Sequence, residues 1–163
     1  MSDLTITITV AALCALTLAG LGGALTKIDS WYRNLRKPSW QPPDWLFGPA
    51  WTLILGMAAA AGVLAWRGTA TTNQRIEVVA LFAANAFFHA LWSPLFFTWK
   101  RPDWALFEVG FLWASILALV VGLAPYSVTA SWLVAPYLAW VTFAAYLNLT
   151  IVRLNGPFTR PSI

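Results

Sequence analysis

One short segment of this sequence concentrates side chains that can stack on a flat ring and neutralise an acid. Between residues 31 and 51 it holds four tryptophans, four prolines and three basic residues, flanked by two long apolar runs. The aromatic and basic residues are Trp31, Trp40, Trp45 and Trp51, with Arg33, Arg36 and Lys37. Indole rings favour a membrane–water boundary, because their bodies are apolar and their N–H groups need a partner. We therefore predict an ordered cover at a membrane surface, suited to a flat anionic ligand.

A polar stripe lies within an apolar stretch further along the chain. Its members are Asn85, His89 and Ser93, spaced four residues apart as on one face of a helix, with Trp92 beside them. Polar groups inside a membrane are costly and need a partner or a task. They can hydrogen-bond between helices, each contributing about 1 kcal/mol, or they can line a ligand pocket. The spacing leaves both interpretations open for His89.

The last apolar stretch carries a second such face. Its residues are Tyr137, Trp140, Ala144 and Asn148, at helical spacings of three, seven and eleven from the first. If the two faces turn toward each other, they form an aromatic pocket with a few hydrogen-bonding groups. Most small-molecule sites have this composition.

Other functions are disfavoured by the residues of the apolar stretches. These contain no Ser–His–Asp set and no glycine-rich phosphate loop. Glu77 and Glu108 come near the starts of their stretches, where we expect them at the membrane interface. The chain has one histidine and one cysteine, Cys14, so ligand spacing for a metal is missing. No basic stripe forms for nucleic acid. We expect no catalytic residue, no metal site and no obligatory cofactor, and we favour binding over catalysis or coupled transport.

The composition predicts the elements that position these residues. The chain has 163 residues, of which 60% are hydrophobic and 10% are charged, whereas soluble domains carry about 25% charged residues. Helices that cross a bilayer core of roughly 30 Å need about 20 apolar residues. Five stretches reach that length, namely 4–26, 45–66, 76–98, 104–124 and 128–152. We predict an all-α integral membrane protein, a five-transmembrane-helix bundle in a single domain, 1–163, with the first stretch retained as a helix.

The basic residues predict the orientation of this bundle. Eight of them fall on one side of the membrane, namely Lys27, Arg33, Arg36, Lys37, Lys100, Arg101, Arg153 and Arg160. Only Arg67 and Arg75 fall on the other side. Cytoplasmic loops carry the excess of positive charge. We therefore predict that the N-terminus faces out and that the tryptophan-rich loop and the C-terminus face the cytoplasm.

Several local signals refine this arrangement. The short link 124–127 makes the last two helices antiparallel neighbours, and Pro94 and Pro136 should kink theirs. The tripeptide Pro-Asp-Trp occurs at 43–45 and 102–104, where each Asp can cap a helix. Small residues such as Ala80 and Ala84 let helices approach closely, either within the bundle or across a homodimer.

Three motifs, in order along the chain, resemble those of the TspO/translocator-protein family, the peripheral benzodiazepine receptors. The first loop matches at Trp31-Tyr32, Leu35, Lys37-Pro38, Trp40, Pro42-Pro43, Trp45 and Trp51. The third stretch matches from Trp92 to Phe97. The fifth matches from Pro136 to Trp140, at Phe143-Ala144 and at Leu147-Asn148.

This resemblance implies a five-helix bundle, often a homodimer, that binds tetrapyrroles such as protoporphyrin IX and haem. Many members also bind cholesterol and synthetic isoquinoline or benzodiazepine ligands. The implied pocket lies among the helices beneath the first loop. Its implied residues are Trp31, Trp40, Trp45 and Trp51; Asn85, His89 and Trp92; Trp104; and Trp140, Ala144, Leu147 and Asn148.

The chain departs from the family pattern at three positions that bear on its ligand. His89 stands where the family usually has Asn, Asn85 where Gln is common, and Leu55 where Tyr is frequent. The strict sterol-recognition pattern fails at Tyr146 and Arg153, although a reversed pattern from Arg101 to Val109 fits.

Our leading hypothesis is therefore a membrane receptor or sensor for tetrapyrroles, with Arg33, Arg36 or Lys37 pairing with the propionates. There are two alternatives, namely light-dependent degradation of bound porphyrin, which the resemblance implies, and passive translocation of porphyrin or sterol. The expected partners are a tetrapyrrole, a sterol, the lipid bilayer and a second copy of the chain.

Overall fold

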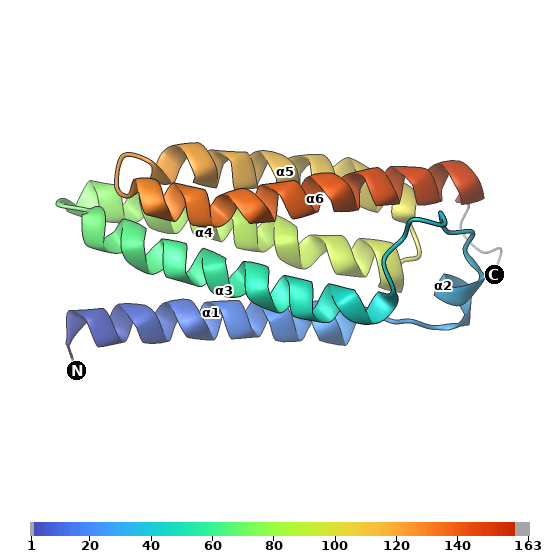
Figure 1. Cartoon of the computed structure of the whole chain (residues 1–163), viewed down its shortest axis with the longest axis horizontal. Coiled ribbons are helices and arrows are strands. Elements are labelled where there is room, and N and C mark those ends of the chain that lie inside the picture. Colours follow the sequence, from blue (N-terminus) through green and yellow to red (C-terminus); the bar gives the residue numbers. More distant parts are fainter. Residues whose placement is uncertain (1, 159–163) are drawn as a thin grey trace.

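Long apolar helices dominate the computed structural model, which describes residues 2–158. Five of them run along the long axis of the molecule, namely α1 (Asp3–Leu25), α3 (Asp44–Gly68), α4 (Thr72–Ser93), α5 (Pro102–Leu123) and α6 (Val128–Asn155) (Figure 1). A short helix, α2 (Ser30–Asn34), lies in the connection between α1 and α3. The five long helices are long and apolar enough to cross a membrane. Arg160, counted in the charge argument, lies outside the described residues.

The predicted stretches correspond to these helices, and the largest difference is at the start of the third. Helix α4 begins at Thr72, four residues before the predicted stretch. Thr71 and Gln74 form a capping box there, with each side chain bonded to the backbone of the other residue. The first turn is polar, so a search for apolar length misses it.

At Pro94 the third membrane span changes its winding instead of only bending. Residues Pro94–Thr98 form a π-helix, η1, in which Trp99 N–H donates to the Pro94 carbonyl at 2.9 Å. A proline lacks the N–H of a regular α-helical turn, and wider turns re-satisfy the freed carbonyls. The segment buries Leu95, Phe96 and Phe97.

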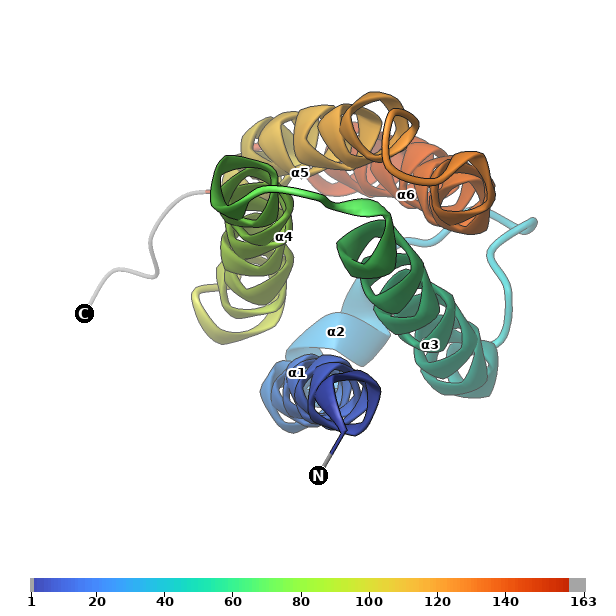
Figure 2. The same cartoon turned by 90° about the vertical axis from the view of Figure 1, so that its left-hand side faces the viewer.

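Seen end-on, the five long helices form a ring (Figure 2). Helix α1 packs on α3, α3 on α6, α6 on α5, and α5 on α4, which contacts α1 in turn. Helices α5 and α6 are antiparallel neighbours, as their short link predicts. Their shared seam is the best-buried part of the molecule, with Ile116, Leu119 and Val134 completely covered.

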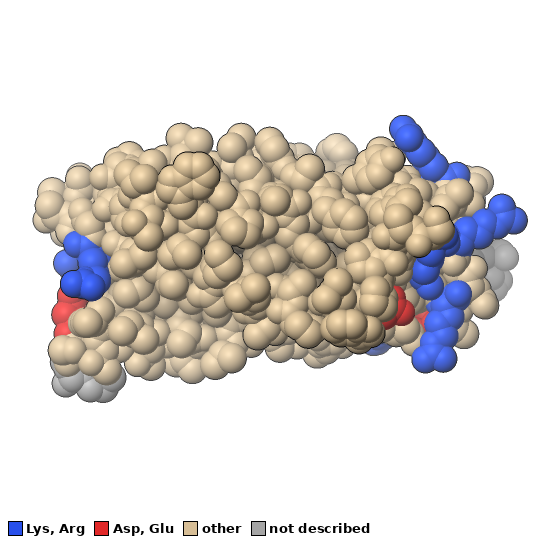
Figure 3. Space-filling model, in the orientation of Figure 1, with Lys and Arg blue, Asp and Glu red and all other residues tan. Residues whose placement is uncertain are grey.

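The two ends of the bundle differ in structure and in charge. At one end the α3–α4 and α5–α6 turns meet, and Tyr126 Oη donates to Glu77 Oε2 at 2.6 Å. The other end carries the connection with α2. Lysines and arginines gather mainly at this second end, and an uncharged band separates it from the first (Figure 3). The charge asymmetry expected from the sequence is thus present in the folded chain.

Two expectations about acidic residues are wrong. Neither Asp of the Pro-Asp-Trp tripeptides caps its helix, because the N-cap residues are Pro43 and Arg101 and neither makes a side-chain cap bond. Asp103 instead pairs with Arg101. Glu108, expected at the membrane interface, is instead buried among the helices, and both carboxylate oxygens lack a hydrogen-bond partner among the described residues.

Candidate ligand-binding site

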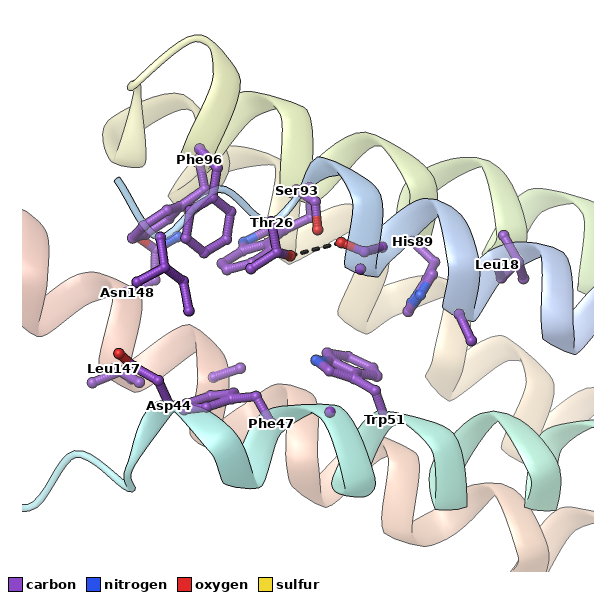
Figure 4. A pocket seen from close by; sticks show the side chains of 18 of the residues that line it. Leu18, Thr26, Asp44, Phe47, Trp51, His89, Ser93, Phe96, Leu147 and Asn148 are labelled. Atoms are coloured by element: carbon purple, nitrogen blue, oxygen red, sulfur yellow. Dashed lines mark hydrogen bonds between the residues drawn. The ribbon is translucent and has the colours of Figure 1, made fainter. Parts of the chain in front are cut away.

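A cavity of about 440 Å³ opens inside the ring near the α2 end (Figure 4). Helices α1, α3, α4 and α6 supply most of its wall, and the connection around α2 closes one end. Its volume is that of a typical small-molecule site. The site residues predicted from the sequence that line it are Trp51, His89, Trp92, Ala144, Leu147 and Asn148.

Aromatic rings form two sides of the cavity. On α3, the Trp51 ring meets the His89 ring edge-on, with 4.9 Å between the centroids. On the α4 side, Trp92 stacks on Phe96 with 5.0 Å between the centroids. The cavity therefore offers flat apolar faces from two directions, as a planar aromatic ligand requires.

His89 is held in one orientation by a buried tyrosine. Its Nδ1 lies 2.9 Å from Tyr137 Oη, and Tyr137 is 1% exposed. No hydrogen bond to Nε2 is present among the described residues. The imidazole stands at the cavity wall beside Trp51 (Figure 4). It thus brings one oriented ring nitrogen to the cavity, with Tyr137 as support behind it.

The polar residues of the stripe on α4 have different roles: some line the cavity, and one instead forms a hydrogen bond to a neighbouring helix. His89 and Ser93 line the cavity, whereas Asn85 donates to Ser115 Oγ on α5 at 3.1 Å. Steps of four residues rotate by about 40° on a helix of 3.6 residues per turn. Over two steps the stripe therefore turns from the α5 contact toward the cavity.

The face of α6 behaves similarly. Ala144, Leu147 and Asn148 line the cavity, but Tyr137 and Trp140 lie behind its wall. The Trp140 ring packs edge-on against Trp51, with centroids 6.3 Å apart, and so supports it. The Asn148 amide fits an orientation in which its nitrogen donates to the Pro102 carbonyl and its oxygen accepts from Leu106 N–H. Its polar atoms then hold the start of α5.

The other predicted tryptophans lie away from the cavity wall. Trp31 packs on Phe96 and has Lys100 over its ring. Trp40 stacks on Tyr146, and Trp45 is 71% exposed. Trp104 faces outward on α5, in a separate shallow hollow with Glu108. Their wide distribution matches rings at a membrane–water boundary better than one stacking surface.

The connection itself is fastened to three neighbouring elements. Tyr32 Oη donates to Asp44 Oδ1 on α3 at 2.9 Å. Asp29 pairs with Lys100, which follows η1, at 3.1 Å. The backbone of Arg36 exchanges two hydrogen bonds with the Asn155 amide at the end of α6. The connection is thus an ordered cover over this end of the bundle.

Two ionisable groups of this cover have altered pKa values. The backbone N–H of Tyr32, and then Lys100, lower the pKa of Asp29. Burial, and then the bond to Asp44, raise the pKa of Tyr32. The Tyr32 hydroxyl therefore stays protonated and donates to Asp44 throughout the neutral range.

The predicted propionate partners do not line the cavity. Arg33 and Arg36 are exposed, and Lys37 lies over the Tyr32 ring, 4.0 Å from its centroid. The cover instead contributes Tyr32 and Gln41 to the wall. Any pairing of these three cations with a ligand would take place outside the cavity, at the membrane surface.

Several wall residues were missed from the sequence. Helix α1 supplies Leu18 and Gly22. Its C-cap residue, Thr26, and the first residue of α3, Asp44, also line the cavity. The spacing of Gly22 and Thr26, four residues apart and so on one face of a helix, is the signal that the sequence offers in this region. Because Asp44 was expected to cap its helix, it was not expected in the cavity wall.

Comparison with known proteins agrees with this architecture. The model of the TspO/MBR family matches residues 9–154. The chain is 42% identical to the tryptophan-rich protein TspO of Chlorobaculum tepidum over 88% of this chain and 94% of that protein. It is 38% identical to the tryptophan-rich sensory protein of Cereibacter sphaeroides over 82% of each chain. It is 31% identical to the human translocator protein over 77% of this chain and 75% of that protein.

The family model covers most of the chain, all five spans are present, and the cavity lies beneath the tryptophan-rich connection. The chain is an integral, multi-pass membrane protein and belongs to the TspO/MBR family.

Proposed function

We propose that this protein is a membrane receptor or sensor that binds tetrapyrroles, protoporphyrin IX and haem, in the cavity beneath the connection. The observation that carries the proposal is the cavity itself, with Trp51 on one side and the Trp92–Phe96 stack on another. Aromatic walls of this kind bind flat conjugated rings by stacking and burial. The name of the Cereibacter sphaeroides relative, a sensory protein, supports the same role.

The residues at the wall also fit an iron-containing ring. Haem iron in proteins is commonly held by a histidine nitrogen. His89 Nε2 would hold it here, because Tyr137 engages Nδ1 and leaves Nε2 toward the cavity. Such support by a hydrogen bond to the second ring nitrogen is usual for histidine ligands.

The direct test is a titration of the purified protein with protoporphyrin IX, followed by tryptophan fluorescence. We expect saturable quenching in the wild type, and a loss of affinity of about tenfold in Trp51→Ala, because that ring forms part of the wall. Trp45→Ala is the matched control, since Trp45 is 71% exposed and lies outside the cavity wall. Equal affinities in wild type and Trp51→Ala would contradict the proposal.

Binding of other apolar ligands, translocation and light-dependent degradation are further predictions for this cavity. A cavity with apolar walls also accepts sterols or synthetic isoquinoline and benzodiazepine ligands. Translocation is supported by the name of the human relative, a translocator protein. Light-dependent degradation of the ring would use indole groups such as Trp51 and Trp92, which stand at the wall.

We propose that the end carrying the connection faces the cytoplasm. Most lysines and arginines gather there, and this excess is typical of the cytoplasmic side. A homodimer also stays a prediction. The small residues Ala80 and Ala84 lie exposed on the outer face of α4, where lipid or a second copy can cover them.

A further inference from the structure

The wall of the cavity contains a single formally charged side chain among the described residues, and that side chain is acidic. It is Asp44, the first residue of α3. No lysine or arginine of the described chain lines the cavity. The cavity wall is therefore acidic, although the cations on the nearby surface would indicate a basic site.

The Asp44 carboxylate is held in place but not neutralised. Its Oδ1 accepts from Tyr32 Oη at 2.9 Å and from Gln41 Nε2 at 3.3 Å. Both donors are uncharged, and Asp44 forms no ion pair among the described residues. Lys37, a cation of the cover, lies over the ring of Tyr32, 4.0 Å from its centroid. Figure 4 shows the Asp44 side chain directed into the space between α3 and the opposite wall.

The position of Asp44 in its helix is favourable for an acidic side chain, because it is the first residue of α3. The N-terminus of a helix carries free N–H groups and a partial positive charge, which attract anions. At the start of α3 the side chain of Asp44 brings its own negative charge to that place. A ligand carboxylate at this end of the cavity meets like charge, whereas an ester, amide or amine group does not.

We infer that Asp44 sets the charge selectivity of the cavity, which takes flat apolar ligands whose group beside α2 and α3 is neutral or cationic in preference to a carboxylate. The inference rests on the proposed function and specifies its ligand class. A free dicarboxylic porphyrin binds only if its propionates avoid Asp44 and extend to the cations outside. An esterified or amine-bearing ring has no such restriction.

The experiment compares protoporphyrin IX with its dimethyl ester in wild type and in Asp44→Asn. The ratio of the two dissociation constants, diacid over diester, is measured in each protein. We expect this ratio to be at least about threefold higher in wild type, because the like-charge repulsion is lost in the variant. The change should come from tighter binding of the diacid, with diester affinity little altered. Comparing ratios cancels the unequal partition of the two rings into detergent.

Asp3→Asn is the matched control, because it removes the same charge at the first residue of α1, outside the cavity wall. Its diacid-to-diester ratio should stay near that of the wild type, and Asp44→Ser should repeat the result of Asp44→Asn. An equal ratio in wild type and Asp44→Asn would overturn the inference, as would an equal shift in Asp3→Asn. If neither ring binds saturably, that result contradicts the proposed function itself, and the inference with it.

Discussion

Single side chains decide what this cavity can bind, and His89 shows it best. The family resemblance leads one to expect Asn at this position, and both side chains can bond Tyr137. Only an imidazole keeps a second nitrogen for the cavity once the first is engaged. The two interpretations of His89 are therefore both correct in part. It forms a hydrogen bond between helices, to Tyr137, and it also lines the cavity.

We predict that His89→Asn reduces the affinity for haem more than the affinity for metal-free protoporphyrin IX. The amide keeps a bond to Tyr137 but is a much poorer ligand for iron. The measurement is the haem Soret band, which in wild type should differ from that of free haem and in the variant should move toward it. Ser93→Ala is the control, because Ser93 lines the cavity without offering an imidazole. An unchanged Soret band in His89→Asn would contradict the prediction.

At the scale of elements, the connection between α1 and α3 behaves as a structured part of the site. It contains only five helical residues, Ser30–Asn34, so its order depends on bonds to its neighbours. Exposed ion pairs such as Asp29–Lys100 contribute little. The buried Tyr32 ring and its bond to Asp44 are therefore the main attachment to α3.

We predict that Tyr32→Phe loosens the connection and increases tryptic cleavage after Arg33 and Arg36. The change removes one hydrogen bond, whose loss also leaves the Asp44 oxygen less well satisfied, at about 1 kcal/mol. The measurement is limited proteolysis of the purified protein, with cleavage sites read by mass spectrometry. Tyr146→Phe is the control, since the Tyr146 ring is 58% exposed and stacks on Trp40 through its face. Equal cleavage rates in both variants would refute this role.

For the whole molecule, closure of the ring depends on the end opposite the connection. There the last residue of α3, Gly68, approaches the α5–α6 turn so closely that a Cβ atom would lie 2.0 Å from the Tyr126 carbonyl oxygen. The partner is backbone, which cannot rotate away as a side chain does. The two turns are thus in direct contact because position 68 has no side chain.

We predict that Gly68→Ala lowers the thermal midpoint of unfolding by several degrees, equivalent to about 1–3 kcal/mol of steric strain. Gly56→Ala is the matched control, because no atom lies within 4 Å of the position its Cβ would take. Alanine favours a helix over glycine, so this variant should be neutral or slightly more stable. The measurement is thermal unfolding of both variants in the same detergent. An unaltered midpoint in Gly68→Ala would show that the two turns separate without cost.

The sequence by itself determined the properties that depend on local composition. The five spans follow from apolar length, the antiparallel α5–α6 pair from a short link, and the charge difference between the ends from where the basic residues fall. These signals need no knowledge of which helix faces which. The bilayer requires long apolar helices, so length and hydropathy are sufficient to find them.

Only the tertiary structure decided which side chains meet at the cavity. It turned His89 inward and Asn85 toward α5, placed Trp140 behind Trp51, and brought in α1 with Gly22 and Thr26. It also directed Asp44 to the wall, where a tripeptide pattern had indicated a cap. The physical reason is that a cavity wall depends on how each helix is rotated and on its neighbours. Those are set by packing between segments far apart in the sequence.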